Sequence, residues 1–158
     1  MLIVQIKPSL RKAKNGDLDF VFELNKVNFK DFIDKIRGWD DKIEYQDLKQ
    51  IFHPDGDFII TLDKKDIGFL SLQFNSNNIH VRHIEILPQY KHKGIGTKIF
   101  DSLKEKELPI TLEVTKNNIP AYLFYRKLGF QVMDEVKTLK NGVRGAIPII
   151  KVMMKLNV

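Results

Sequence analysis

One basic stretch of the sequence, residues 84–97 (IEILPQYKHKGIGT), has the residue types that could bind a phosphate group. A β-rich run leads through a proline into a loop whose glycines, Gly94 and Gly96, open a predicted helix. Unpaired amides at a helix N-terminus, with the helix dipole behind them, attract anions. Nearby side chains add positive charge and a hydroxyl donor: Lys91, Lys93, Lys98 and Thr97. The stretch predicts a phosphate-binding loop, although a solvated basic turn has the same composition.

Two common phosphate-binding motifs do not fit this loop. A P-loop requires G-x-x-x-x-G-K-[ST], which the run from Gly94 to Lys98 does not supply. A dinucleotide-binding turn requires G-x-G-x-x-G directly after its strand and an acidic residue about 20 positions later. Glu113 lies near that distance, but Ile99 occupies the position of the third glycine. A loop for the diphosphate of coenzyme A is the remaining candidate.

The elements that must position this loop predict one mixed sheet with helices on its faces. Apolar residues at helical spacing run from Asp17 to Gly38, and a weaker helical pattern covers residues 41–52. Further helices are predicted over residues 95–107 and 120–128. Strands are predicted over residues 2–6, 58–62, 67–74, 79–87, 110–114, 130–136 and 147–156, with a turn at Asn141-Gly142. We therefore expect an α/β (α+β) fold with a mostly antiparallel sheet, in one domain spanning residues 1–158.

Composition narrows the class of protein. The chain has 158 residues, of which 43% are apolar and 29% charged, as in ordinary globular domains. No apolar run approaches the roughly 18 residues of a membrane span, and the start shows no signal-peptide pattern, so we expect a cytoplasmic protein. The chain has no cysteine, which excludes disulfides, thiol nucleophiles and cysteine-based zinc sites. A net charge of +6 favours a polyanion or a phosphate-bearing cofactor.

Two segments resemble the signature motifs of the Gcn5-related N-acetyltransferase (GNAT) superfamily. Residues 84–96 (IEILPQYKHKGIG) are similar to motif A, [QR]-x-x-G-x-[GA] after a strand and a proline. Residues 112–130 (LEVTKNNIPAYLFYRKLGF) are similar to motif B, with its N-x-x-A and Y-x-x-x-G-F. Two positions depart from the family. Lys91 stands where Gln or Arg is usual and meets a phosphate without the fork of Arg, while His92 replaces a glycine and tolerates fewer backbone conformations.

The resemblance implies transfer of acetyl from acetyl-coenzyme A to a primary amine of a small molecule or peptide, by direct attack in a ternary complex and without a metal. It also implies that the strand holding residues 84–86 splays from its neighbour and that the pantetheine arm lies in the gap. The coenzyme-binding residues that it implies are Ile84, Glu85, Ile86, Lys91, His92, Lys93, Gly94, Ile95, Gly96, Thr97, Asn118 and Tyr125.

Acetyl transfer to an amine calls for a base, because a lysine-type amine has a pKa of about 10.4 and must attack unprotonated. A general base contributes roughly 10²–10⁴-fold. Glu113 is the first candidate, since it lies on a strand beside the implied gap and matches a glutamate assigned as base in the ribosomal-protein alanine acetyltransferase branch. Alternatively, Glu113 forms only an ion pair with a lysine. Glu85, on the motif A strand, is the second candidate.

The departing thiolate needs a proton, and a phenol with a pKa of about 10 can supply it. By the resemblance, Tyr125 lies near the coenzyme sulfur and takes this role, while the amide of Ile86 stabilises the oxyanion. The alternative is that Tyr125 only packs in an aromatic cluster with Tyr122 and Phe124.

The acceptor side of the site is less defined in sequence. Trp39, Asp40 and Asp41 could hold a cationic amine by cation–π contact and charge, or could form a packed tryptophan beside an acidic helix cap. His80 and His83 point to opposite faces of one strand and cannot share a metal, although His80 could approach the gap.

Two other functional classes remain open. A non-catalytic acyl-coenzyme A sensor of the same fold is the alternative to an enzyme. The departures from the family motif at Lys91 and His92 would favour this alternative. A nucleic-acid binder should interleave basic and aromatic residues on one face. The basic residues here gather instead around the glycine loop. We expect no nucleic-acid or membrane partner, and a monomer or a homodimer.

Overall fold

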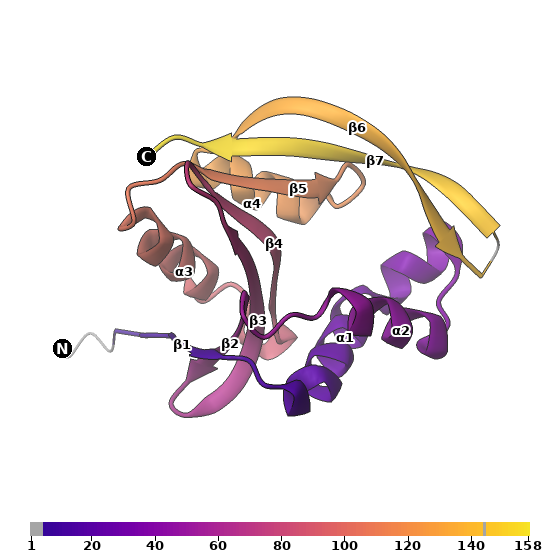
Figure 1. Cartoon of the computed structure of the whole chain (residues 1–158), viewed down its shortest axis with the longest axis horizontal. Helices are drawn as coiled ribbons and strands as arrows, with labels where there is room; N and C mark the ends of the chain where they lie inside the picture. The colour runs from indigo at the N-terminus through magenta and orange to yellow at the C-terminus, as the bar shows by residue number, and fades with distance from the viewer. Residues whose placement is uncertain (1–4, 144) are drawn as a thin grey trace.

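The computed structural model describes residues 5–143 and 145–158, and in them four α-helices accompany a seven-stranded sheet. The elements are, in chain order, β1 (Ser9–Lys12), α1 (Leu18–Arg37), α2 (Asp41–Ile51), β2 (Asp57–Leu62), β3 (Lys65–Phe74), β4 (Ile79–Ile86), α3 (Ile95–Lys104), β5 (Ile110–Thr115), α4 (Ile119–Leu128), β6 (Gln131–Gly142) and β7 (Gly145–Leu156). The strand order is β1-β2-β3-β4-β5-β7-β6, and β4–β5 is the one parallel pair within it (Figure 1). The predicted fold class is confirmed.

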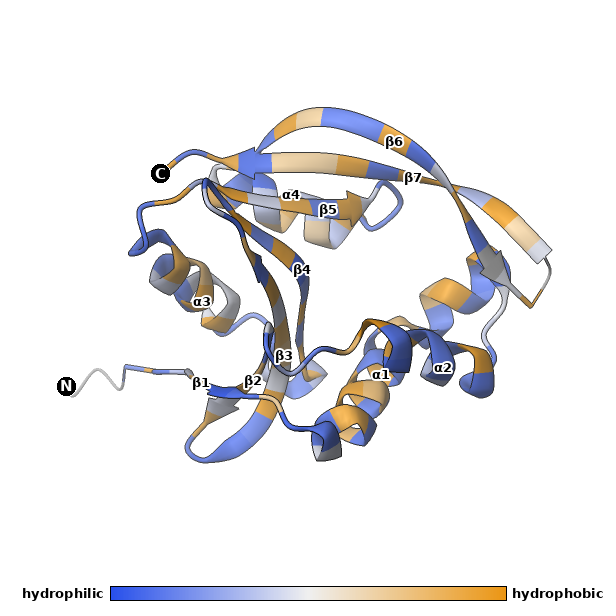
Figure 2. Ribbon diagram, viewed as in Figure 1, coloured by the Kyte–Doolittle hydropathy of each residue, from blue (hydrophilic) through white to orange (hydrophobic). Residues whose placement is uncertain are grey.

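Helices cover both faces of this sheet. On one face, the apolar sides of α3 and α4 pack on the strands, and on the other α1 packs against β2 and β3. Figure 2 shows both apolar and polar residues along α1 and α3, as expected for helices that bury one side. No helix in the described ranges is both long and apolar enough to cross a membrane.

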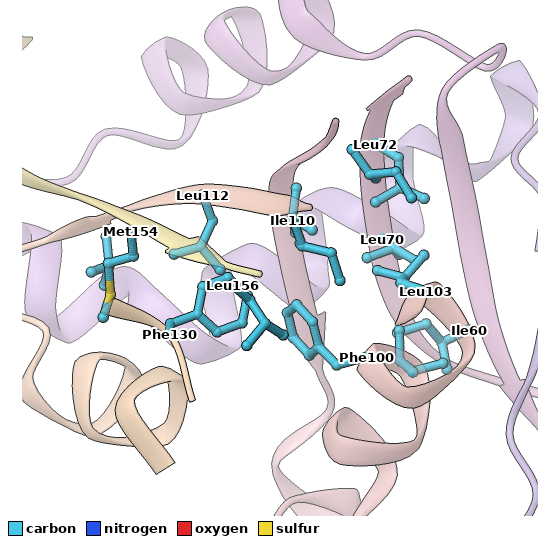
Figure 3. Packing of buried hydrophobic residues seen from close by; sticks show 14 of the residues in the cluster. Ile60, Leu70, Leu72, Phe100, Leu103, Ile110, Leu112, Phe130, Met154 and Leu156 are labelled. Carbon is cyan, nitrogen blue, oxygen red and sulfur yellow. The ribbon is translucent and has the colours of Figure 1, made fainter. Parts of the chain in front are cut away.

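The larger core lies between α3, α4 and the middle of the sheet (Figure 3). Four residues of α3 at helical spacing are buried there: Ile95, Ile99, Phe100 and Leu103. The ring of Phe100 is completely buried and meets Phe130 edge-on, with 5.6 Å between the ring centroids. Asn118 caps α4 by accepting from the amide of Ala121, and Gly129, at φ 103°, ends that helix. This core fixes α4, and therefore motif B, against the start of α3.

The first predicted strand is wrong at Gln5 and Ile6, which are not in a strand, and its residues 2–4 lie outside the described part of the chain. The strand that forms is β1, which begins after Pro8 and pairs with β2. Its sequence, SLRK, has no apolar run because β1 is an edge strand and its side chains are mostly exposed. Instead, Arg11 anchors it through ion pairs with Asp17 and Asp66.

The closing hairpin is longer than predicted, and its turn lies elsewhere. Asn141 and Gly142 still pair with β7, so the turn falls between Gly142 and Gly145. A Cβ atom on Gly142 would lie 2.4 Å from the carbonyl oxygen of Arg37. Glycine is therefore required at position 142 for close contact with the end of α1, and not for a turn. This contact carries the hairpin tip across to α1 (Figure 1).

The parallel strands β4 and β5 separate soon after they meet. They pair from Ile79↔Ile110 to Val81↔Leu112, whereas β4 continues to Ile86 and β5 to Thr115. The outer end of β4 is held by α1 instead, because Asn25 donates to the Glu85 carboxylate and Asn28 to the carbonyl of Ile86, both at 3.0 Å. The splay implied by the family resemblance is thus present.

Candidate active site

The loop before α3 presents a row of backbone amides to solvent. The first helical hydrogen bond of α3 runs from the amide of Lys98 to the carbonyl of Gly94, at 3.1 Å. The amides of residues 92–97 have no protein acceptor in the described ranges. A Cβ atom on Gly94 would meet nothing within 4 Å, whereas one on Gly96 would lie 3.0 Å from the ring of Phe124, so the loop is open at Gly94 and packs on α4 at Gly96. Unpaired amides at a helix N-terminus fit a phosphate or diphosphate.

His92 lies in the left-handed region, at φ 61°, which explains why glycine is usual there. The loop keeps the shape that a glycine would favour, at a conformational cost of about 1–2 kcal/mol. Lys91, Lys93 and Thr97 are exposed beside the amides and can reach an anion. The side chain of Ile95, in contrast, is buried in the core, so only its amide can contribute to binding.

A cavity of about 330 Å³ opens where β4 and β5 separate. Its walls come from α1, the two splayed strands, the start of α4 and the β6–β7 hairpin. Four predicted site residues line it: Ile84, Glu113, Asn118 and Tyr125. The remaining predicted residues lie elsewhere, because Ile86 is at the far end of β4 and residues 91–97 lie at the start of α3. The structure therefore contains a phosphate-type loop and a separate cavity, joined by the splayed edge of β4.

Tyr125 lines this cavity, and its ring packs in an aromatic cluster. The predicted packing with Phe124 is present, while its place near the coenzyme sulfur stays a prediction. Its ring centroid lies 5.5 Å from that of Phe124, 5.7 Å from that of Phe130 and 5.9 Å from that of Phe100. Burial raises the pKa of Tyr125 to about 12. The hydroxyl has no hydrogen-bond partner within residues 5–143 and 145–158, so it is available to a ligand as a protonated donor.

Glu113 lines the cavity from β5, and 37% of its side chain is exposed. One carboxylate oxygen lies 3.5 Å from the amine of Lys151 on β7. The predicted ion pair with a lysine is thus present, and it leaves the carboxylate on the cavity wall. A carboxylate in this position can accept a proton from a molecule in the cavity.

Glu85 differs from Glu113 because it is buried under α1 and does not line the cavity. Its Oε1 accepts from Asn25 and lies 2.8 Å from Nε2 of His83, while no described group donates a hydrogen bond to its buried Oε2. This carboxylate holds α1 and β4 together and is poorly placed to act as a base on a substrate.

His83 does line the cavity, and the sequence analysis missed it. Burial of its ring lowers the pKa of His83, but the Glu85 carboxylate, with a smaller effect from Asp57, raises it by more, so the pKa is raised overall. The signal that could have identified the pair is their spacing, because residues i and i+2 share a face of a strand.

We expect His83→Gln to destabilise the protein more at low pH than at high pH. Because the folded pKa of His83 is raised above its ordinary value of 6.5, its charge stabilises the fold fully below about pH 6.5, and this contribution is lost as the pH rises through the folded value. Melting temperatures of both proteins at about pH 5.5 and pH 8.5 measure the effect. His53→Gln, at an exposed histidine, is the control. A deficit of equal size at both pH values would contradict the assignment.

His80 does not approach the cavity. Its Nδ1 lies 2.8 Å from the hydroxyl oxygen of Thr111, at the end where β4 and β5 are paired. Burial lowers the pKa of His80, which keeps the ring neutral at pH 7. His80 is therefore not among the residues that line the cavity, and its ring pairs with Thr111 instead.

Of the two alternatives for Trp39, Asp40 and Asp41, the structure shows the packed tryptophan beside an acidic helix cap. Trp39 donates from Nε1 to Asp41 at 2.6 Å, and Asp41 pairs with Lys26 at 2.8 Å. The carboxylate of Asp40 caps α2 by accepting from the amide of Ile43. The cavity lining contains neither the tryptophan nor these acids.

Comparison with known proteins identifies the family. The family described as "Acetyltransferase (GNAT) domain" matches residues 54–132, half of the chain. An N-alpha-acetyltransferase of Sulfurisphaera tokodaii is 28% identical over 148 residues, which cover 84% of this chain and 83% of the relative. A putative [ribosomal protein bS18]-alanine N-acetyltransferase of Bacillus subtilis is 25% identical over 134 residues, covering 81% of this chain and 83% of the relative.

The fold is shared with solved acetyltransferases. The PaiA N-acetyltransferase of Thermoplasma acidophilum, crystallised with coenzyme A, superposes with a TM-score of 0.66 at 18% identity, covering 97% of this chain and 100% of that one. Arabidopsis thaliana Naa50, crystallised with the bisubstrate analogue CoA-Ac-MVNAL, gives 0.64 at 17% identity, covering 96% and 99%. The chain belongs to the GNAT acetyltransferases, and it is an acetyl-coenzyme A-dependent acetyltransferase.

Proposed function

We propose that this enzyme, acting through one domain over residues 1–158, acetylates the α-amine at the N-terminus of a polypeptide. The main support for the proposal is that strand β4 leads from a cavity to a loop with free backbone amides. Unpaired amides of residues 92–97 lie at one end of β4, and a cavity lined by Glu113 and Tyr125 lies beside its splayed length. Relatives described as N-alpha-acetyltransferase and ribosomal-protein alanine N-acetyltransferase support a polypeptide acceptor.

On the coenzyme side, the amides of residues 92–97 bind the diphosphate of acetyl-coenzyme A, and Lys91 and Lys93 neutralise its charge. The pantetheine arm lies along the free edge of β4 at Ile84, Glu85 and Ile86. A backbone edge that lacks a neighbouring strand offers the donors and acceptors that an extended amide chain requires. Asn118 and Tyr125 complete the binding site at the start of α4 and near the sulfur.

On the chemical side, Glu113 takes one proton from the ammonium group, directly or through water, and the freed lone pair forms a C–N bond to the thioester carbonyl carbon. The nitrogen of the intermediate then loses a second proton to water. A backbone amide on the free edge of β4 beside the cavity stabilises the resulting oxyanion. As the intermediate collapses, the C–S bond breaks and the Tyr125 hydroxyl donates its proton to the departing sulfur. The products are the acetylated amine and coenzyme A, and no metal takes part.

Two measurements test the proposed function. Calorimetry with acetyl-coenzyme A should detect binding, and peptides with free α-amines should release coenzyme A thiol and gain the mass of one acetyl group. N-terminally blocked copies of the same peptides serve as controls. Binding of acetyl-coenzyme A without turnover of any amine or peptide would instead support the sensor function. Turnover of polyamines alone would contradict the polypeptide acceptor.

A further inference from the structure

The walls of the cavity carry more positive than negative charge. Four cationic side chains line it, one each from α1, β4, β6 and β7: Arg37, Arg82, Lys140 and Lys151. Glu113 is the one carboxylate in the same lining. A ligand with complementary charge would therefore be anionic where it contacts these walls.

Ion pairs within the protein use most of this charge. Arg37 pairs with buried Glu44, the guanidinium of Arg82 lies 3.8 Å from the buried carboxylate of Asp57, and Lys151 contacts Glu113. Lys140 is different. No carboxylate in the described part of the chain lies within ion-pair distance of its amine. Lys140 is thus the cation at the cavity whose charge is available to a ligand.

The position of Lys140 determines which side chains of an acceptor peptide lie near its positive charge. Lys140 pairs with Ile147, on the hairpin face that also bears Ile149 and Lys151. Lys151 marks the position of Glu113 and lies four residue steps along β7 from Ile147, about 13 Å at 3.3 Å per step. An extended peptide whose α-amine lies at Glu113 therefore brings its second to fourth side chains within reach of the long Lys140 side chain.

The wall formed by α1 is mostly apolar and contacts a different part of the acceptor. Phe29, Phe32, Ile33 and Ile36 face the cavity from α1. The tip of the hairpin closes on the end of α1, since the Cβ of Val143 would lie 2.8 Å from a Cβ on Gly38. The cavity is thus bounded on one side by apolar rings and branched chains and on the other by a lysine.

We propose that the acceptor is a polypeptide with an apolar first residue and an acidic side chain among its second to fourth residues, which pairs with Lys140. The inference rests on the proposed function and specifies its substrate class. A solvent-exposed ion pair contributes up to about 1 kcal/mol, so the preference for an acidic over a neutral peptide should be about fivefold in kcat/KM.

The test uses three peptides that begin with the same apolar residue and differ only at positions two and three, which are both Glu, both Gln or both Lys. The wild-type enzyme should favour the Glu peptide over the Gln peptide by about fivefold, and added salt should reduce the ratio. Lys140→Gln should bring the ratio close to one, and Lys140→Glu should favour the Lys peptide. Lys137→Gln, on the opposite face of β6 and exposed, is the matched control and should keep the wild-type ratio.

The outcomes separate this inference from the proposed function. Equal turnover of the three peptides by the wild-type enzyme, or an unchanged preference in Lys140→Gln, would overturn the acidic acceptor and leave the N-terminal acetyltransferase intact. If no peptide were acetylated although acetyl-coenzyme A bound, both proposals would be overturned together.

Discussion

Glu113→Gln should lower kcat about a hundredfold, within the roughly 10²–10⁴-fold range of a general base. The substitution keeps the shape of the side chain and removes its ability to accept a proton. Because the carboxylate lies on the cavity wall and is 37% exposed, its loss should change the melting temperature little. Rates of coenzyme A release, measured from pH 6 to pH 9 with a saturating peptide, give both the loss and its pH dependence.

Lys151→Gln is the matched control, because it breaks the same ion pair from the other side and leaves the carboxylate in place. If Glu113 acts as the base, Lys151→Gln should retain most of the activity that Glu113→Gln loses. If the ion pair is purely structural, the two variants should have similar and small effects on kcat. That second pattern would remove Glu113 from the mechanism.

Tyr125→Phe should lower kcat at least about tenfold while coenzyme affinity stays nearly unchanged, since only a proton donor is lost. Burial raises the pKa of Tyr125 to about 12, so the phenol remains protonated throughout the working pH range. The ring keeps its contacts with Phe100 and Phe130, and the variant should fold normally. Turnover measurements together with calorimetric titration of coenzyme A separate the two effects.

Tyr122→Phe provides the comparison for this variant. Tyr122 lies on the same helix and packs on the same core, but it does not line the cavity. It should therefore keep wild-type kcat. Equal turnover by Tyr125→Phe and the wild-type enzyme would exclude Tyr125 as the proton donor.

Local patterns were sufficient to predict the loop, the helix cap and the helix end that the proposed coenzyme site uses. The glycine loop, the cap at Asn118 and the glycine end of α4 depend on residues within one turn of each other, so their spacing is visible in the sequence. Apolar periodicity likewise predicted α1 to α4 and the central strands. Strand β1 was not predicted, because an edge strand with exposed side chains has no apolar pattern.

The acceptor half of the site depends on contacts between distant segments, which no local pattern contains. Arg37 and Lys140 meet at one cavity only because Gly142 lets the hairpin tip approach the end of α1. The Asn141-Gly142 pair predicted a turn because glycine is common in turns. At position 142, however, glycine is needed for the close contact with Arg37, and sequence does not distinguish these two uses. Trp39 and the acids after it were one candidate site for a cationic amine. In the structure, Asp40 caps α2 and Asp41 forms an ion pair with Lys26.

The short parallel seam between β4 and β5 also has a mechanical consequence. Three residue pairs join the β1–β4 half of the sheet to the β5–β7 half, so the strand pairing of the sheet is shortest along that line. In the proposed binding mode, the pantetheine arm lies on the free edge of β4 as an added strand and strengthens the connection between the two halves. Binding of acetyl-coenzyme A would then make the acceptor pocket more rigid. This favours a binding order in which acetyl-coenzyme A enters before the amine.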